Sequence, residues 1–336
     1  MRVDEVGEHA LLARILARLP RPSSTVLVGP GDDAAVVAPV RNERLVVTTD
    51  AIVEEVHFSR AYSSPADVGH KALAVNLSDL AAMAATPRWA LVSLVLPGSW
   101  PVNDVEDLVD GLAALASRHG VAVAGGNITR TDGPLVVDVT AGGGVAPRRW
   151  LTRSGAKAGH EIYVSGAIGG AAAGLEMLGA SQGSGLGSQG SGCIARHRRP
   201  EPRVRLGVAM GRARAATAGI DLSDGLADAL RQVASASEVG VRIDSEAVPV
   251  DAGAREWWTS RGVDPVSAAV AGGDDYELLF AVPPKSGGAL RAIARHVADP
   301  ALTKIGMFTK DPRERVLARA GKENALPEGF EHFAHR

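Results

Sequence analysis

Aspartates in this chain gather in short clusters flanked by glycine or hydroxyl residues. The clusters are Asp32 and Asp33 in Gly-Pro-Gly-Asp-Asp, Asp50 after Thr48-Thr49, Asp79 in Asn-Leu-Ser-Asp, Asp221 and Asp224 in Asp-Leu-Ser-Asp-Gly, and Asp274 with Asp275 after Gly272-Gly273. Carboxylates that accumulate without nearby lysine or arginine repel one another, so a fold that brings several together needs hard cations to hold them. The pattern therefore predicts a site for Mg²⁺ and a polyphosphate.

Length and composition limit the kind of protein this can be. A chain of 336 residues, of which 46% are hydrophobic, can bury one large core or two medium ones, and average domain sizes favour two. The formal net charge of −2 offers no basic field for nucleic acid or for an anionic membrane surface. An anionic substrate would therefore need local help from metals or from a few basic side chains.

The cysteine content and the amino-terminal segment indicate a cytoplasmic protein. Cys193 is the lone cysteine, which excludes an internal disulfide framework and a cysteine-based zinc site. The first twenty residues mix charged and apolar positions, which predicts a short amphipathic helix and not a signal peptide. No apolar run is long enough to span a bilayer.

Strand and helix patterns alternate along the chain and predict an α/β (α+β) fold with two domains, 1–147 and 148–336. Expected strands cover 26–28, 34–38, 45–47, 89–96, 121–124, 135–145, 162–165, 241–243 and 276–282. Expected helices cover 65–85, 105–118, 171–178, 202–218 and 226–236. The segment 181–192 consists of Gly, Ser, Gln and Leu, and we expect a low-complexity loop there. Its formal Gly-x-Gly-x-x-Gly match lacks the strand-to-helix context of a dinucleotide site.

Each acidic motif also has an ordinary structural explanation. Gly-Pro-Gly-Asp-Asp is a common composition for a surface turn, and Asp-Leu-Ser-Asp is typical of a helix amino-terminal cap. Gly-Asp-Asp and Leu-Ser-Asp each occur in both halves, which fits either a duplicated unit or coincidence. Asp79 differs, because it lies in a pattern of Ala, Leu and Met that predicts a buried helix face, where an unpaired carboxylate is costly. A metal would remove that cost.

Three further features are candidate contacts for a phosphorylated ligand. Gly125-Gly126-Asn127 follows a short strand, and its glycines would let backbone amides approach a phosphate, although a plain turn remains an alternative. Arg153 lies near Lys157 and could clamp a phosphate or form a solvated basic turn. His57 is a lone histidine, and most such histidines are structural or merely exposed.

The ordered series of motifs resembles the thiamine-monophosphate kinase family, within the superfamily that also holds aminoimidazole ribonucleotide synthetase and selenophosphate synthetase. The likeness covers most of the chain and rests on Gly7-Glu8, Gly-Asp-Asp-Ala-Ala, Thr-Thr-Asp, His57-Phe58, Lys-Ala-Leu-Ala-Val-Asn-Leu-Ser-Asp-Leu-Ala-Ala-Met, Gly-Gly-Asn-Ile-Thr-Arg, Leu-Thr-Arg-Ser-Gly-Ala-Lys, Ile-Asp-Leu-Ser-Asp-Gly-Leu, Gly-Gly-Asp-Asp-Tyr-Glu-Leu and Gly329-Phe330-Glu-His-Phe. The resemblance implies a two-domain aminoimidazole ribonucleotide synthetase-like fold, with the first half forming a homodimer through its strands.

The same resemblance implies ATP-dependent phosphorylation of thiamine monophosphate to thiamine diphosphate, with several Mg²⁺ ions between the phosphates. It implies metal ligands at Asp33, Thr48, Thr49, Asp50, Asp79, Asn127, Asp221 and Asp224. It implies ATP contacts at Gly125, Gly126, Arg153 and Ser223, and substrate contacts at His57, Asp274 and Phe330. The acceptor is a phosphate monoester, mostly dianionic at neutral pH because its second pKa is about 6, so direct in-line transfer needs no catalytic general base.

Two positions depart from the family pattern. The family usually has Asp where this chain has Asn127, which can offer a carbonyl oxygen but no negative charge to Mg²⁺. Glu is common where Asp274 stands, so its reach is one methylene shorter. The alternatives are another ATP-dependent synthetase of the superfamily, or a nucleotide-binding member without catalysis. The absence of a reactive cysteine near the amino terminus argues against selenophosphate synthesis.

Overall fold

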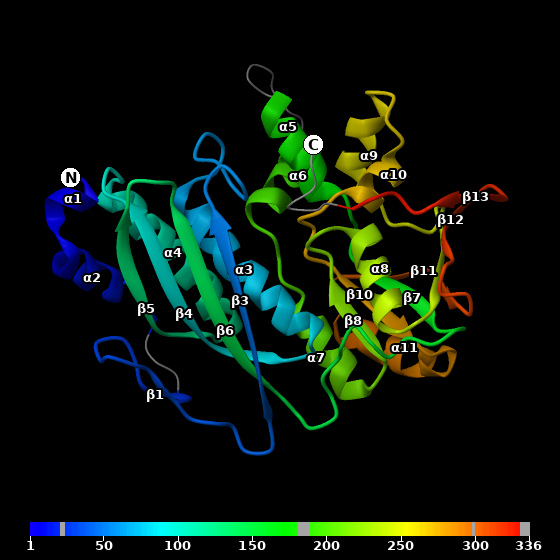
Figure 1. Ribbon diagram of the computed structural model, residues 1–336, viewed down its shortest axis with the longest axis horizontal. Helices are drawn as coiled ribbons and strands as arrows, with labels where there is room; N and C mark the ends of the chain where they lie inside the picture. The colour runs from blue at the N-terminus through cyan, green and yellow to red at the C-terminus, as the bar shows by residue number, and fades with distance from the viewer. Residues whose placement is uncertain (21–23, 181–187, 298–299, 330–336) are drawn as a thin grey trace. The chain divides into compact units, whose positions relative to one another are not determined.

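The computed structural model describes residues 1–20, 24–180, 188–297 and 300–329, and these form a mixed α/β protein (Figure 1). The chain divides into two compact units. The first consists of 1–80 and 85–147, and the second consists of 81–84 and 148–336. Among the described helices, none is long and apolar enough to cross a membrane.

A four-stranded sheet forms the framework of the first unit. Its strands are β3 (Arg44–Val53), β6 (Val136–Val145), β4 (Thr86–Pro97) and β5 (Ala122–Thr131), in that order, and they lie side by side in Figure 1. β6 pairs antiparallel with both neighbours, whereas β4 and β5 are parallel. A parallel pair needs a crossover connection, and the helix α4 (Val102–His119) supplies it.

Glycine contacts join α4 to the long helix α3 (Pro65–Ala82). A Cβ on Gly69 would collide with the backbone oxygen of Leu108, and one on Gly111 would collide with that of Ala66. The two helices therefore approach closely enough for their backbones to meet. The remaining elements of this unit are α1 (Val3–Val6), α2 (Glu8–Leu16) and the short antiparallel pair β1 (Val26–Val28) and β2 (Val36–Val37).

The second unit is built on a seven-stranded sheet in the order β13-β12-β9-β11-β7-β10-β8. Its strands are β7 (Glu161–Ser165), β8 (Ala218–Asp221), β9 (Gly240–Asp244), β10 (Leu278–Val282), β11 (Leu302–Thr309), β12 (Arg315–Arg319) and β13 (Lys322–Ala325). The described pairs are antiparallel except β12 with β9. The strand β10, which lies between β7 and β8, is buried along its whole length, and this accounts for its unbroken apolar run Leu-Leu-Phe-Ala-Val.

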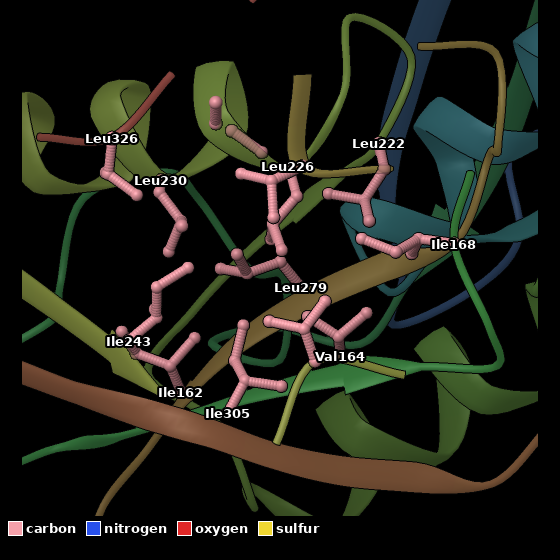
Figure 2. Packing of buried hydrophobic residues seen from close by; sticks show 14 of the residues in the cluster. Ile162, Val164, Ile168, Leu222, Leu226, Leu230, Ile243, Leu279, Ile305 and Leu326 are labelled. Carbon is pink, nitrogen blue, oxygen red and sulfur yellow. The ribbon is translucent and has the colours of Figure 1, made fainter. Parts of the chain in front are cut away.

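Helices surround this sheet and complete the core. They are α5 (Gly170–Ala180), α6 (Ser188–Arg198), α7 (Val204–Ala213), α8 (Leu226–Ala236), α9 (Ala252–Thr259), α10 (Pro265–Ala271), the 3₁₀ turn η1 (Pro284–Ser286) and α11 (Gly287–His296). Figure 2 shows Leu226 and Leu230 of α8 packed with the strand residues Ile162, Ile243 and Leu279. Burial of such side chains stabilises the fold by about 1.5–3 kcal/mol each.

Two expectations from the sequence are wrong in the second unit. The helix expected over 202–218 ends at Ala213, and Ala218 begins the buried strand β8, because Gly219 packs closely against Leu151 and Phe280. The loop expected over 181–192 is helical from Ser188 onward. That helix is stabilised by tertiary packing, since Cys193 is buried against α5, whereas residues 181–187 lie outside the described part of the chain.

Candidate functional site

In the first unit, strand β3 and helix α3 bring two predicted metal ligands into contact. Thr48 Oγ1 donates a hydrogen bond to Asp79 Oδ2 over 2.5 Å. One turn earlier on α3, Asn76 Nδ2 donates to the backbone oxygens of Ala72, at 3.1 Å, and Asp50, at 3.5 Å. The helix is thereby attached to the strand at Thr48 and Asp50, and it holds Asp79 beside them.

The side-chain oxygen of Asn76 bears on what this region can bind. Its Oδ1 atom is buried and has no hydrogen-bond partner among the described groups. A buried polar atom left unpaired is costly unless a water or a ligand completes it. The nearby oxygens of Thr48, Asp50 and Asp79 are the hard donors that Mg²⁺ takes, and Mg²⁺ commonly keeps several waters while binding one or two carboxylates. The residues present therefore fit a hydrated Mg²⁺.

Thr49 lies on the opposite face of the same strand, because successive side chains of a strand alternate. Its hydroxyl contacts Thr140 Oγ1 at 3.0 Å and donates to Asp138 Oδ1 at 3.2 Å. The register of β6, β4 and β5 then aligns Asp138, Ser93 and Asn127 across the sheet. The structure thus separates two groups of predicted ligands: Thr48, Asp50 and Asp79 on one face, and Thr49 with Asn127 on the other.

Asp33 lies with the second of these groups. Together with Asn127 and Asp138 it lines a cavity of about 850 Å³ in the first unit. Gly125 and Gly126 also line this cavity, where β5 bulges against β4. A Cβ on Gly126 would collide with the backbone oxygen of Val92, so strand packing alone already requires glycine at this position.

His57 is fixed by its backbone neighbours just after β3. Its Nδ1 atom accepts the N–H of Val53 at 3.1 Å, so in the neutral ring the proton is on Nε2. The buried Lys71 donates from Nζ to the backbone oxygen of His57 at 3.0 Å. His57 therefore has a defined orientation, and the ring can offer its Nε2–H as a donor.

In the second unit, two loops carry predicted ligands and pair through their backbones. Asp274 N–H donates to the backbone oxygen of Ser223 at 2.7 Å, and Tyr276 N–H donates to that of Leu222 at 3.1 Å. The N–H of Leu222 in turn donates to the backbone oxygen of Glu277 at 2.8 Å. These bonds bring Asp221, Ser223 and Asp224 of the first loop next to Asp274 of the second.

Glycines make that close approach feasible. Gly225 has a φ of 94°, and a Cβ there would collide with the backbone oxygen of Gly272. A Cβ on Gly273 would lie 2.7 Å from the backbone oxygen of Ser223. The glycines that flank the acidic motifs therefore serve the contact between the loops in addition to the turns themselves.

Two buried acids secure the second loop. Asp275 accepts the N–H of Gly169 at 2.6 Å and that of Ala171 at 3.3 Å, and burial raises the pKa of its carboxyl to about 7. Glu277 is fully buried and accepts from Ser165 Oγ at 2.5 Å and from Arg203 Nε at 2.8 Å. Burial raises the pKa of Glu277, while Arg203 opposes that shift.

Of the two remaining predicted residues, Arg153 and Phe330, the structure describes Arg153. Arg153 is exposed, and the backbone oxygen of its neighbour Thr152 accepts the N–H of Gly219 at 3.0 Å, near the start of β8. Phe330 lies outside the described residues. Gly329, directly before it, is beside Asp224, since a Cβ there would lie 3.3 Å from the backbone oxygen of Asp224.

The acids do not close into a complete metal site by themselves. Among the residues that the structure describes, no group of three or more His, Cys, Asp or Glu side chains is placed to hold a metal ion. Hydroxyl, amide and water oxygens would have to supplement the carboxylates. Sequence reasoning missed Asp138 and Asn76, although the alternation in Val-Val-Asp-Val-Thr already indicates a polar face on β6.

Comparison with known proteins agrees with this arrangement of two units. Residues 31–145 match the family model "AIR synthase related protein, N-terminal domain", and residues 157–319 match "AIR synthase related protein, C-terminal domain". The chain is thus an AIR synthase related protein with both domains of that family.

Relatives over the full length narrow the assignment. The chain is 39% identical over 335 residues to thiamine-monophosphate kinase of Escherichia coli K12, covering 98% of both chains. It is 34% identical over 320 residues to the Bacillus subtilis enzyme of the same name, covering 92% of this chain and 94% of that one. The chain therefore belongs to the thiamine-monophosphate kinase family.

Solved structures also show this chain to be similar in fold to proteins of the thiamine-monophosphate kinase family, as two examples illustrate. The crystal structure of thiamine-monophosphate kinase from Stenotrophomonas maltophilia K279a superposes with a TM-score of 0.80 at 37% identity, covering 94% of this chain and 95% of that one. AaThiL complexed with AMPPCP and TMP superposes with a TM-score of 0.77 at 32% identity, covering 99% of each chain.

Proposed function

We propose that this protein transfers the γ-phosphoryl group of ATP to thiamine monophosphate, forming thiamine diphosphate, by direct in-line transfer in the presence of several Mg²⁺ ions. The observation that carries the proposal is the full-length similarity to thiamine-monophosphate kinases, together with a relative that has been crystallised with AMPPCP and TMP. The Thr48–Asp79 contact and the pairing of the two acidic loops in the second unit support it.

Each of the two units carries proposed metal ligands. In the first unit they are Asp33, Thr48, Thr49, Asp50, Asp79 and Asn127, and in the second they are Asp221 and Asp224. Bound Mg²⁺ would neutralise charge on the phosphates, which is the main requirement when one anion must approach another. This accounts for a site rich in acids whose substrates are themselves anionic.

The protein groups have the tasks of binding and orientation. We propose that Gly125, Gly126, Arg153 and Ser223 contact ATP, with Arg153 able to hold a phosphate through its planar guanidinium. No side chain need remove a proton, because the acceptor phosphate is already mostly dianionic at neutral pH, with a second pKa of about 6. Positioning and charge neutralisation would then supply the rate enhancement.

The acceptor side is assigned to His57, Asp274 and Phe330. The thiazolium ring of thiamine monophosphate is cationic, so an acidic or aromatic neighbour favours it. Asp274 provides a carboxylate that is 32% exposed, in a loop held by backbone hydrogen bonds. We place the enzyme in the cytoplasm, where ATP is plentiful.

We also propose a homodimer formed through the sheet of the first unit. β3 is an edge strand of ten residues, and its apolar side chains Leu45 and Val47 are 68% and 51% exposed. A long edge strand with exposed apolar side chains is normally covered by another chain or blocked by charge. A second copy of this protein would cover it.

A single-turnover reaction with γ-³²P-labelled ATP tests the direct transfer. The proposal predicts that the label passes from ATP to thiamine diphosphate and that no labelled protein accumulates when the acceptor is left out. A phosphorylated protein trapped from ATP alone would contradict in-line transfer. ATP binding with no labelled product would favour a nucleotide-binding protein without catalysis.

A further inference from the structure

The carboxylate of Asp274 is contacted on both of its oxygens by groups that the proposed site does not include. Tyr276 donates its hydroxyl to Oδ1 over 3.3 Å. The Nδ1 atom of His197, on α6, lies 3.5 Å from Oδ2, a separation typical of an ion pair and longer than a good hydrogen bond. One carboxylate is thus hydrogen-bonded on one oxygen by Tyr276 and approached at the other by the ring of His197.

The backbone of this loop is strained at the same residues. Asp274 has a φ of 67° and Tyr276 has a φ of 49°, both in the left-handed region that L-residues rarely adopt. Such conformations persist only where the surroundings fix them, and they concentrate at functional sites. Here the surroundings are the buried acid between them, Asp275, and the adjacent Glu277 with its partner Arg203.

The two contacting side chains are buried, whereas the carboxylate is partly exposed. His197 is 3% exposed and Tyr276 is 8% exposed, while the side chain of Asp274 is 32% exposed. Cys193, one turn before His197 on α6, is also buried. The buried pair therefore forms a fixed backing for a carboxylate whose other side can meet a ligand.

Two neighbouring guanidinium groups contact the acids around this loop. Arg203 binds Glu277, and Arg196 lies 3.3 Å from Asp251 and 3.7 Å from Glu277. The side chain of Asp274 is 32% exposed, so a cationic group of a ligand can reach the carboxylate. An aspartate on a strained backbone has little freedom to adjust its reach, so its orientation should decide how well a cationic ring binds.

We propose that Tyr276 and His197 are positioning residues that fix the Asp274 carboxylate toward the cationic ring of the acceptor substrate, an inference that rests on the proposed function. They would act on binding of the acceptor and not on ATP or on phosphoryl transfer. A purely structural role would instead lower the stability of the fold and alter the kinetics of both substrates together.

Steady-state kinetics of Tyr276→Phe and His197→Ala test this distinction. Each is expected to raise KM for thiamine monophosphate by about 5- to 10-fold, the usual effect of one lost polar contact, with kcat and KM for ATP unchanged. His197→Asn should restore only part of the affinity, because its amide nitrogen can take the place of Nδ1 but carries no charge. His296→Ala, at an exposed histidine on α11, is the matched control.

A double-mutant cycle with Asp274→Gly gives the decisive comparison. Glycine tolerates the left-handed φ of residue 274, so this variant removes the carboxylate without adding backbone strain. If the two residues act through Asp274, Tyr276→Phe and His197→Ala will have no further effect on KM in the Asp274→Gly background. Equal effects in both backgrounds would overturn the proposal.

Failure of the proposed function is distinguishable from failure of this inference. If the unaltered protein forms no thiamine diphosphate, the kinase proposal fails, and the same cycle is then measured on thiamine monophosphate binding by calorimetry. Binding that depends on Tyr276 and His197 only when Asp274 is present would still support the positioning role. Absence of binding, or binding indifferent to all three, would overturn it.

Discussion

Thr48 on β3 donates its hydroxyl to the carboxylate of Asp79 on α3 across 2.5 Å. This contact joins the strand and the helix at a point where both carry predicted metal ligands. It also gives a half-buried carboxylate an oriented neighbour that can remain in place when a cation binds. Substitution of either residue is therefore expected to lower enzymatic activity.

Asp79→Ala should lower kcat for thiamine diphosphate formation by about 100-fold or more while the protein stays folded, since the change removes a proposed metal ligand. Thr48→Val, which keeps the side-chain shape, should lower activity by about 10-fold through poorer orientation of Asp79. Kinetics over a range of Mg²⁺ concentrations, with circular dichroism as a check on folding, measure both effects. Asp132→Ala at an exposed turn is the control. Unchanged turnover in Asp79→Ala would remove Asp79 from the site.

Gly225→Ala should destabilise the protein by more than the strain of a left-handed residue alone. Its Cβ would collide with the backbone oxygen of Gly272, so the two acidic loops of the second unit would have to separate. Gly262→Ala is a matched control, because Gly262 has a φ of 70° with open space around it and should lose only about 1 kcal/mol. Urea unfolding compares the two. Equal losses of unfolding free energy would show that the loop contact is unimportant.

Asp275 should make stability depend on pH in a defined direction. In the folded state its carboxyl keeps its proton up to about pH 7, whereas in the unfolded chain it releases it near its ordinary value of 3.8. Between these values the folded state binds more protons, so the free energy of unfolding contributed by Asp275 falls as pH rises and levels off above the folded pKa.

The measurement is urea unfolding of the unaltered protein and of Asp275→Asn across this pH range. Asn can still accept the N–H of Gly169 but does not titrate. The stability of the unaltered protein relative to Asp275→Asn should decrease from acidic to neutral pH. A relative stability that rises with pH over that range would contradict the raised pKa.

Leu45→Asp should dissociate the proposed homodimer. The leucine is 68% exposed on the edge strand β3, and a charge there would be buried and unpaired if a second copy covered it. Sedimentation velocity should show a dimer for the unaltered protein and a monomer for the variant. Leu175→Asp, at an exposed leucine of the second unit, is the control. A variant that remains dimeric would place the interface elsewhere.

Elements with strong local signals could be predicted from the sequence, and those fixed by tertiary contacts could not. The helix expected over 226–236 is α8, because an amphipathic repeat follows a motif that is suitable for starting a helix. The sequence predicts the end of a helix at Ala218, but this residue begins β8, because the alanine-rich sequence has no strand signal and packing against Phe280 decides the outcome. The elements α9, α10, α11 and β11 to β13 were not anticipated.

In the candidate site, too, the residue types could be predicted from the sequence, whereas the tertiary contacts between them could not. The acidic motifs could be located from residue types, whereas the roles predicted for Thr48 and Thr49 came from the resemblance to the family. The sequence did not reveal that adjacent residues serve opposite faces of β3, nor that Asp138 accompanies Thr49. The contact of Asp274 with His197 joins segments far apart in the chain, so only the fold could reveal it.

The most direct test of the proposed function is thiamine diphosphate formation by the purified protein with ATP, Mg²⁺ and thiamine monophosphate, with thiamine as a parallel acceptor. The account predicts thiamine diphosphate from the monophosphate, and none when EDTA removes the metal. No product from the monophosphate, despite ATP binding and a folded protein, would contradict the account, and Asn127→Asp would be the first variant to examine.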